Sequence, residues 1–577
     1  MPLTPSTGDV VYAGYPSAFV RNFSRNTKKK LTFGIVKHLL WGDWIKVTDY
    51  DYATDPDAEG DLTDEEKDEI KERTEGMIPV RCRGQSGYMD PEDLQADALL
   101  EIVFLDVGQG DGALMITPDN KRYVIDAGKG DNMYRYLKWR FSDFDNSQHD
   151  FDALIITHPD NDHYLGFSDL VEDKEVQAGA IYHNGLMEQF SVNGTKQSGS
   201  ESVRLGRRVE VRKQDFLTDL IQTDKNLRDF LADEEKRRWV SDSSNRPKQY
   251  PELLDKAVRG RRAGSTARRF PKIEMLSTRH GEIVDGKSYL PGFGPDNAKG
   301  CTIQVIGPIV EDADGGPALR TFTDKPRQTT TSMNAGKTKN GHSVLLKLNY
   351  GAVNLLFGGD LNSSAEMFLL SHYTGLDVYD AGEVSAADII AAGRPIFQSD
   401  VAKACHHGSA DFTDSFLGCI NAAATVISSG DEESHAHPRS DTLGAIGHHG
   451  RGHRSLIFST ELARSTREYT DIDDIPAVKA EKLRSEAERE DDADKKAALL
   501  EEADRLDDQT RTRNVTVYGA INLRADKDKI VLAYMLEKPS KSRRWDIYTL
   551  ESTNGGPLAY LPVKEAEKRE EKRREDG

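Results

Sequence analysis

The chain has 577 residues, too many for one ordinary hydrophobic core, so we expect a large domain with insertions and at least one smaller domain. Its net charge of −20 excludes a surface built throughout to bind nucleic acid and leaves only a local basic region for that purpose. The lack of an apolar run of about eighteen residues, and of a basic-then-apolar start, predicts a cytoplasmic protein with neither transmembrane helix nor signal peptide. The four cysteines have no C-x-x-C spacing and are expected to be reduced thiols.

Residues 1–98 are expected to form a separate small β domain. Short apolar stretches at 10–12, 33–36 and 44–47 predict strands, and the acidic stretch from Asp49 to Glu75 predicts a solvated loop with one short helix. A strand at 78–82 and a Gly-aromatic-apolar step at 87–89 follow. This order resembles bacterial SH3-like domains. Another kind of small β-barrel stays open as the alternative.

Residues 99–562 are expected to form a large domain of the α/β class. Its apolar stretches predict buried strands, and the segment 132–141 predicts a helix. The strands are expected at 99–105, 113–116, 123–126, 151–157, 302–306, 343–348, 353–357, 400–405, 424–429, 515–518 and 530–534.

Three charged segments interrupt or follow this pattern. A basic insertion is expected over about 198–300, with arginine and lysine densest as far as Arg279 and a surplus of roughly seven positive charges in that part. The segment 461–512 is rich in Glu, Lys and Ala and predicts one or two charged helices as a second insertion. The tail at 563–577 is charged and is expected to be frayed or helical.

The strongest chemical signal is a cluster of polar side chains directly after the strand at 151–157. His158, Asp160, Asp162 and His163 crowd into six residues. In an extended segment alternate residues point the same way, so His158 and Asp160 can face one metal ion while the other two face a neighbour. Imidazole and carboxylate groups together are ligands of borderline divalent metals. The alternative is a polar surface loop.

Further ligands are expected at other strand ends, because one cluster cannot complete two metal sites. Asp360 follows two glycines, which allow close backbone approach, and its carboxylate could bridge two cations. His406 and His407 follow the strand at 400–405, and His437 follows the strand at 424–429. A single histidine more often has a structural role, but histidines at several strand ends favour a role as metal ligands.

Six motifs in order resemble the metallo-β-lactamase fold, and within it the hydrolase domain of ComEC-type DNA-uptake competence proteins. They are Asp106-Val107-Gly108-Gln109-Gly110-Asp111, Ile125-Asp126-Ala127-Gly128, Thr157-His158-Pro159-Asp160-Asn161-Asp162-His163, Gly358-Gly359-Asp360, His406-His407-Gly408-Ser409 and His437-Pro438.

The resemblance implies a four-layer αββα sandwich with two divalent metal ions, zinc or manganese, at one edge of its sheets. It places metal ligands at His158, Asp160, Asp162, His163, Asp360, one of His406 and His407 (with His407 favoured), and His437. It assigns Asp126 to ordering the ligand loop, and Asp106, Gln109 and Asp111 to lining or bracing the site.

The sequence departs from the family in three ways. Asp160 stands where classical members have a second histidine, and a more carboxylate-rich set lets manganese compete with zinc. The histidine that usually follows this motif has no clear match, and His183 is the only near candidate. There is no run of membrane helices, which excludes a DNA-uptake channel.

These residues predict a metal-dependent phosphodiesterase or nuclease acting on DNA or RNA through a metal-activated hydroxide. Asp162 or Asp360 would hold the hydroxide, and His437 or Ser409 would lie near the departing group.

The substrate prediction depends on the basic insertion. Arg207, Arg208, Arg261 and Arg262 could follow a phosphate backbone, with Trp239, Tyr250 and Phe270 available for base stacking. The alternative is a solvated insertion whose charges bind nothing specific.

Two other functions stay open. One is a hydrolase of small substrates, similar to phosphorylcholine esterases or lactonases. The other is a non-catalytic scaffold that docks partners through the helices of 461–512. A protein partner could also bind the SH3-like domain. A nuclease of this kind would fit bacterial or phage defence, or nucleic-acid processing.

Overall fold

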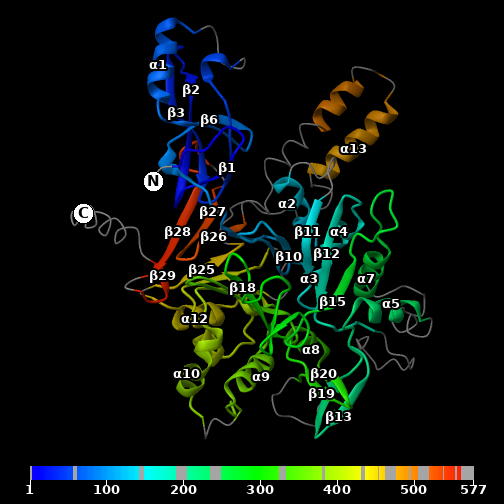
Figure 1. Ribbon diagram of the computed structural model, residues 1–577. Helices are drawn as coiled ribbons and strands as arrows, with labels where there is room; N and C mark the ends of the chain where they lie inside the picture. Colours follow the sequence, from blue (N-terminus) through cyan, green and yellow to red (C-terminus); the bar gives the residue numbers. More distant parts are fainter. Residues whose placement is uncertain are drawn as a thin grey trace.

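The computed structural model of the protein (Figure 1) describes residues 3–55, 62–141, 149–189, 205–233, 249–323, 333–379, 384–430, 436–452, 454–461, 476–490, 492, 495–503, 519–536, 539–552 and 555–560. Within them the chain is a mixed α/β protein with several sheets, as the sequence predicts. None of the helices in these ranges combines the length and apolar character that crossing a membrane requires.

The N-terminal domain is one sheet of antiparallel strands with its own apolar core. The strands are ordered β3-β2-β6-β5-β4-β1-β7, and the core includes Val20, Leu39 and Ile45. The short helix expected in the acidic stretch is α1 (Asp64–Thr74), which starts with a capping box between Thr63 and Glu66. The strands are β1 (Val10–Ala13), β2 (Ser17–Arg25), β3 (Leu31–Leu40), β4 (Trp44–Val47), β5 (Ile78–Cys82), β6 (Gln85–Met89) and β7 (Leu94–Gln95).

The first large sheet has ten strands in the order β15-β12-β11-β10-β9-β8-β26-β27-β28-β29. Its part from β10 to β15 is parallel and the rest is antiparallel. The strands are β8 (Leu100–Phe104), β9 (Gly112–Ile116), β10 (Arg122–Ala127), β11 (His149–Ile155), β12 (Val176–His183), β15 (Lys272–Met275), β26 (Ile521–Ala525), β27 (Lys529–Met535), β28 (Trp545–Ser552) and β29 (Leu558–Tyr560).

The second large sheet has eight strands in the order β16-β17-β18-β21-β22-β23-β24-β25, parallel from β22 onward. The strands are β16 (Glu282–Val284), β17 (Lys287–Tyr289), β18 (Cys301–Gly307), β21 (Leu345–Tyr350), β22 (Val353–Phe357), β23 (Val401–Lys403), β24 (Ala424–Ile427) and β25 (Leu456–Ser459). Every strand expected between 99 and 534 has a counterpart, except 515–518, which lies outside the described residues.

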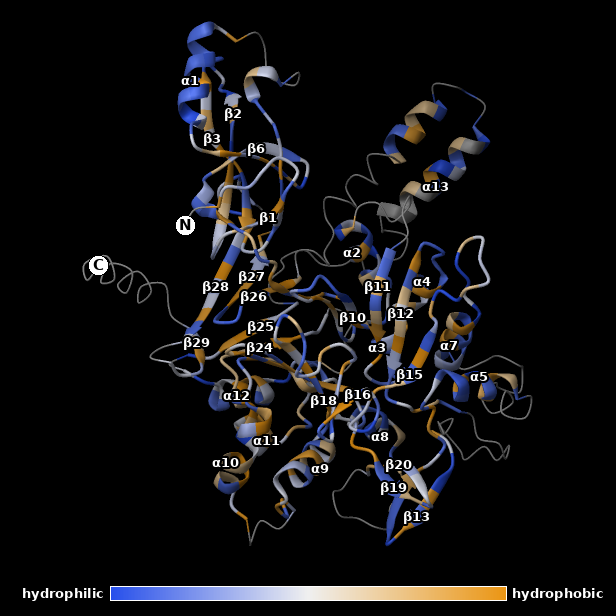
Figure 2. Cartoon of the chain, viewed as in Figure 1, coloured by the Kyte–Doolittle hydropathy of each residue, from blue (hydrophilic) through white to orange (hydrophobic). Residues whose placement is uncertain are grey.

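The two large sheets pack against each other and helices cover their outer faces. Side chains of both sheets share one core, in which the rings of Phe104 and Phe357 lie 6.0 Å apart. Figure 2 shows this apolar character along β24 and β25. Alternate residues point outward, where α2 (Asn132–Arg140), α4 (Phe167–Glu172) and α7 (Gln249–Arg259) cover the first sheet. On the second sheet lie α9 (Ser363–Thr374), α10 (Ala386–Phe397) and α11 (Asp414–Ile420).

The described part of the segment 198–300 contributes mostly to these layers. Helix α5 (Asp224–Ala232), helix α7 and strand β15 pack in the core of the first sheet. Among the described strands of this segment, β13 (Arg208–Val211) and β14 (Gln214–Leu217) lie apart, in a four-stranded sheet with β19 (Glu311–Ala313) and β20 (Gly316–Arg320).

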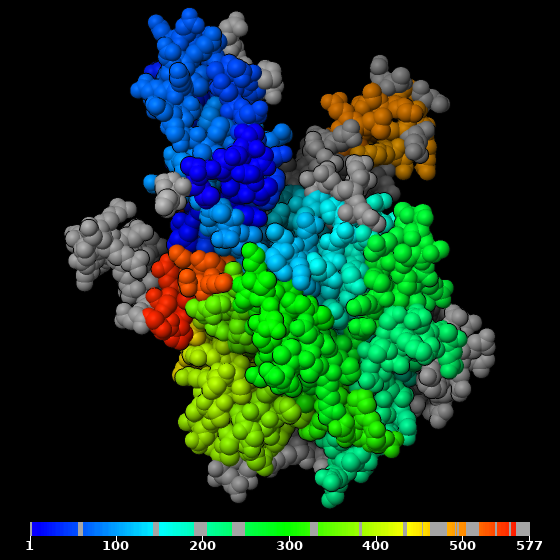
Figure 3. Space-filling model, viewed as in Figure 1, coloured from blue at the N-terminus to red at the C-terminus, as the bar shows by residue number. Residues whose placement is uncertain are grey.

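Two parts project from the layered body. Figure 3 shows the N-terminal domain at one end and, beside it, the region of α13 (Pro476–Arg489), which belongs to the charged segment 461–512. The N-terminal domain docks on the first sheet through Leu40 and Trp41, which share its outer core with Met535 and Trp545. The charged tail at 563–577 lies outside the described residues.

Candidate metal centre

The polar motifs meet because they follow strands whose carboxyl ends lie at one edge of the two sheets. The His158–His163 segment follows β11, Asp360 follows β22, and the histidine pair follows β23. Each of these strands is parallel to at least one neighbour, and in parallel sheets ligands bind beyond the carboxyl ends.

The cluster is centred on the carboxylate of Asp360, which is 2% exposed. Its Oδ2 lies 3.1 Å from His163 Nε2, 3.2 Å from His407 Nε2 and 3.9 Å from His158 Nε2. The carboxylate of Asp162 completes the cluster. Its oxygens lie 3.9 Å from His163 Nε2 and 3.8 Å from His407 Nε2.

These spacings fit a bound cation. Ligand atoms of a tetrahedral site with bonds of about 2.1 Å stand about 3.4 Å apart. The Nε2 atoms of His158, His163 and His407 and Oδ1 of Asp360 are buried and make no hydrogen bond of acceptable geometry. Burying a polar atom costs free energy unless it has a hydrogen-bond partner or binds an ion. The described residues therefore form buried His/Asp groups that could hold a metal ion.

Asp126 orients one of these histidines. It sits at a register shift in β10 with a φ of +52°, and this bulge turns its carboxylate toward the site. Its Oδ2 lies 2.8 Å from His163 Nδ1 and accepts a 2.7 Å hydrogen bond from the Thr157 hydroxyl. A carboxylate on the far nitrogen fixes the ring so that Nε2 faces a metal.

The residues of the turn at 106–111 have different roles at the site. Asp111 lines the site, with Oδ1 3.1 Å from His407 Nδ1 and a direct ion pair to Lys403. Asp106 braces the turn by accepting from Gly108 N at 3.2 Å. Gln109 points outward and accepts from Lys129. Gly110 permits the closest approach, because a Cβ there would meet the carbonyl oxygen of Asp162 at 1.7 Å.

Of the histidine pair, only His407 joins the cluster. Both residues have positive φ, 48° and 53°, so the chain turns sharply between them. The Nδ1 of His407 lies 3.1 Å from Ser428 O, which fixes the ring with Nε2 inward. His406 turns to His437, their rings 5.6 Å apart. Neither His406 nor His437 belongs to a potential metal group among the described residues.

Three residues of the site were not predicted from the sequence. Lys403 is buried, donates to Gly359 O at 3.0 Å and pairs with Asp111. Lys339 contacts Asp160 and lies 3.0 Å from Glu188 Oε1. Lys403 could have been suspected from the sequence, because a lysine is unusual within the apolar strand 401–405. No local sequence feature distinguishes Lys339 or Glu188.

The electrostatics of the cluster follow from this burial. Burial alone would raise the pKa of Asp360, but the His163 and His407 rings hold the pKa well below its usual value. Burial alone would lower the pKa of Lys403, but Asp111 and Asp360 raise it. The Asp360 carboxylate is thus charged and attracts cations.

His183 does not supply the missing histidine. It is fully buried, its Nδ1 accepts from Gly185 N at 3.0 Å, and burial lowers its pKa to about 4. It belongs to no potential metal group within the described ranges.

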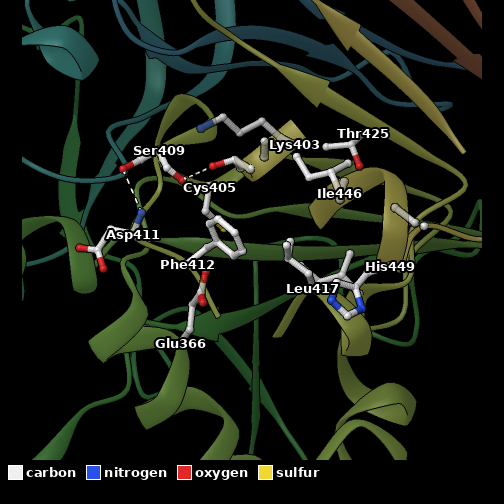
Figure 4. A pocket seen from close by; sticks show the side chains of 16 residues that line it. Glu366, Lys403, Cys405, Ser409, Asp411, Phe412, Leu417, Thr425, Ile446 and His449 are labelled. Carbon is white, nitrogen blue, oxygen red and sulfur yellow. Dashed lines mark hydrogen bonds between the residues drawn. The ribbon is translucent and has the colours of Figure 1, made fainter. Parts of the chain in front are cut away.

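Ser409 lines a hollow behind the histidine turn (Figure 4). The hollow also contains Glu366, Cys405 and Phe412, and its volume of about 30 Å³ leaves room for water but not for a substrate. The Ser409 hydroxyl accepts from Asp411 N at 3.2 Å.

The expected stacking residues are wrong in two of three cases. Tyr250 and Phe270 are fully buried in the core of the first sheet because α7 and β15 belong to its layers. Trp239 lies outside the described residues.

Among the described residues, part of the predicted basic track is engaged in ion pairs. Arg207 pairs with Asp314 at 3.1 Å and Arg208 with Asp215 at 3.4 Å on the β13–β14 hairpin. Arg261 and Arg262 are exposed in the loop after α7, where Arg261 donates to Val258 O at 2.8 Å.

Known proteins give no independent guide to the site: neither models of protein families nor the curated proteins contain a match to this sequence.

Proposed function

We propose that the protein is a metal-dependent hydrolase that cleaves phosphodiesters, with DNA or RNA as its substrate class. The observation that carries the proposal is the group of buried, unsatisfied histidine and aspartate atoms around Asp360. The six ordered motifs and the order of layers, helices on sheet on sheet on helices, support a metallo-β-lactamase fold resembling the hydrolase domain of ComEC-type proteins.

A divalent cation held by these residues would lower the pKa of a water molecule and offset the charge of a phosphodiester. Asp162 has 21% of its side chain accessible, against 3% for Asp360 and 8% for Asp111. In this proposal it holds the attacking water and accepts its proton at a carboxylate oxygen. Asp360 is enclosed by two histidine rings and serves to bind the cation.

The expectation of two ions, zinc or manganese, belongs to the same proposal. The carboxylates Asp111, Asp160, Asp162 and Asp360 outnumber those of a histidine-rich site, and this favours harder ions such as manganese.

A second candidate is a hydrolase of small phosphodiesters or esters. The ion pairs of Arg207 and Arg208 favour it, because they reduce the positive charge available to a long phosphate backbone.

We further propose that the N-terminal domain is SH3-like and binds a protein partner, for which Trp44, half-exposed on β4, offers an apolar contact. The charged helices of 461–512 are the other candidate contact. Four free cysteines fit a cytoplasmic location, where thiols stay reduced.

The test is cleavage of labelled single- and double-stranded DNA and RNA by the purified chain with added manganese or zinc. Asp162→Ala is expected to lower the rate at least about 100-fold, the scale of a lost catalytic base. Asp528→Ala, in the exposed turn between β26 and β27, is the matched control and should cleave normally.

Equal cleavage by Asp162→Ala and the parent chain would overturn the proposed role. Metal binding without cleavage of any nucleic acid would favour the small-substrate candidate. A chain that binds no metal would leave only a non-catalytic scaffold.

A further inference from the structure

The amino group of Lys339 lies where oxygen atoms gather on the Asp160 side of the cluster. It contacts the Asp160 carboxylate, lies 3.0 Å from Glu188 Oε1 and donates to Pro159 O at 3.3 Å. Its side chain is only 10% exposed. A buried cation held by carboxylate and carbonyl oxygens resembles the setting of a metal ion rather than of a surface lysine.

The local structure places this side chain firmly. Lys339 lies on the short helix α8 (Ala335–Gly341), which Asn334 caps by accepting from Lys337 N at 3.0 Å. The helix turns Lys339 and its neighbours Thr338 and Asn340 into the protein. No local sequence pattern predicts the contact, because α8 is far along the chain from the loop that follows β11.

Asp160 is occupied by these neighbours. The Asn340 amide, oriented by Gly336 O, donates to Asp160 Oδ2 at 2.8 Å, and Lys339 takes the other oxygen. Among the described residues, no three potential ligands that include Asp160 have their atoms within 4.8 Å of one another. All the potential groups instead contain His163 or His407.

Several carboxylates of the cluster are also neutralised by neighbouring groups. Lys339 lies between Asp160 and Glu188, Lys403 pairs with Asp111, and Asp126 is satisfied by His163 and Thr157. The carboxylates that remain at the centre are the buried Asp360, whose Oδ1 lies 3.8 Å from Lys403, and the partly exposed Asp162. Their two negative charges match one divalent cation.

We propose that the centre binds one divalent cation, through Asp162, His163, Asp360 and His407, and that the ammonium group of Lys339 takes the place of a second. This inference depends on the proposed metal-dependent function and replaces its two ions with one. Lys339 is a positioning residue: it neutralises Asp160 and Glu188 and keeps them from binding a metal.

The test is the metal content of the whole chain. The protein is stripped with a chelator, incubated with excess manganese and freed of unbound metal by gel filtration. Metal per chain is then measured by mass spectrometry, and electron paramagnetic resonance separates isolated Mn²⁺ from a coupled pair. We expect one ion per chain, with the spectrum of isolated Mn²⁺.

Lys339→Met keeps the carbon stem and removes the charge, which leaves two buried carboxylates without a counter-ion. It is expected to bind two ions per chain and to show a coupled spectrum. Lys339→Arg keeps the charge and should bind one. The matched control is Lys337→Met on the same helix, whose amino group lies 3.0 Å from Asp411 outside the cluster, and it should also bind one.

Two ions in the unmodified chain would overturn the inference and leave the proposed function intact. A folded Lys339→Met chain that binds one ion would overturn the role of Lys339. If Lys339→Met fails to fold, the content of the unmodified chain and of Lys339→Arg still decides between one ion and two. No ion in any chain would overturn the proposed function itself.

Discussion

At the scale of single residues, the candidate centre depends on histidine rings held from behind. The carboxylate of Asp126 fixes His163, and the carbonyl of Ser428 fixes His407. In both cases the outer nitrogen makes the hydrogen bond, so the inner nitrogen is the one that faces the centre. The backbone strain at Asp126 and at the histidine pair is concentrated where it positions these rings.

Asp126→Asn tests this arrangement. The amide keeps the shape of the side chain but removes the negative charge beside His163 Nδ1, so the ring is held less firmly and is a weaker ligand. Manganese affinity, measured by titration calorimetry, is expected to fall about 10- to 100-fold. Asp152→Asn, on β11 but away from the cluster, should bind manganese normally; an unchanged affinity in Asp126→Asn would exclude an orienting role.

At the scale of elements, α9 connects two ligand-bearing loops. It follows Asp360 directly, and its Glu366 accepts from both the backbone and the hydroxyl of Thr413, at 2.6 and 2.8 Å, at the end of the loop after His407. Burial raises the pKa of Glu366 to about 8. The carboxyl group is therefore protonated in the folded chain at pH values where the unfolded chain is ionised.

This pKa predicts a pH-dependent stability. The contribution of Glu366 is complete below about pH 4.5, and is lost as pH rises to about 8, at about 1.4 kcal/mol per pH unit. Glu366→Gln cannot titrate, so its stability in metal-free urea unfolding should fall less than that of the unmodified chain between pH 5 and 8. Glu252→Gln, on the outer part of α7, should follow the unmodified chain. Parallel curves for Glu366→Gln and the unmodified chain would contradict the raised pKa.

At the scale of the whole molecule, a buried charge network joins the N-terminal domain to the first sheet. Arg524 on β26 lies 3.1 Å from Glu101 and 3.9 Å from Asp43, which also pairs with Arg83 at 2.9 Å. The arginine side chain is 2% exposed. The domain is thus fixed to strands that come from both ends of the large domain, because β8 and β26 are neighbours in the sheet.

Arg524→Met is expected to destabilise the chain by about 3–5 kcal/mol, because it leaves two buried carboxylates with less compensating charge. Urea unfolding at neutral pH measures the loss. Arg543→Met, in the exposed turn before β28, is the control and should change stability by less than about 0.5 kcal/mol. A loss of that small size for Arg524→Met would show that the network does not hold the domain.

The sequence by itself determined the α/β class, most of the strands and the identity of the residues that meet at Asp360. Strands of alternating or continuous apolar residues are local patterns, and so are acids and histidines that follow them. It did not reveal many other elements, among them the strands β2, β12, β15, β25 and β26 and the helices α9 to α11. It predicted a basic insertion over about 198–300 but not that α5, α7 and β15 of this segment pack in the layers.

Only the tertiary structure decided which neighbours the ligand residues have. Whether His406 or His407 faces inward depends on a turn with two positive φ angles. The approach of Lys339 to Asp160, 179 positions away, depends on how α8 packs beside the end of β11. Contacts of this kind arise from the packing of elements that are distant along the chain. A local pattern of residue types does not predict which distant elements pack together.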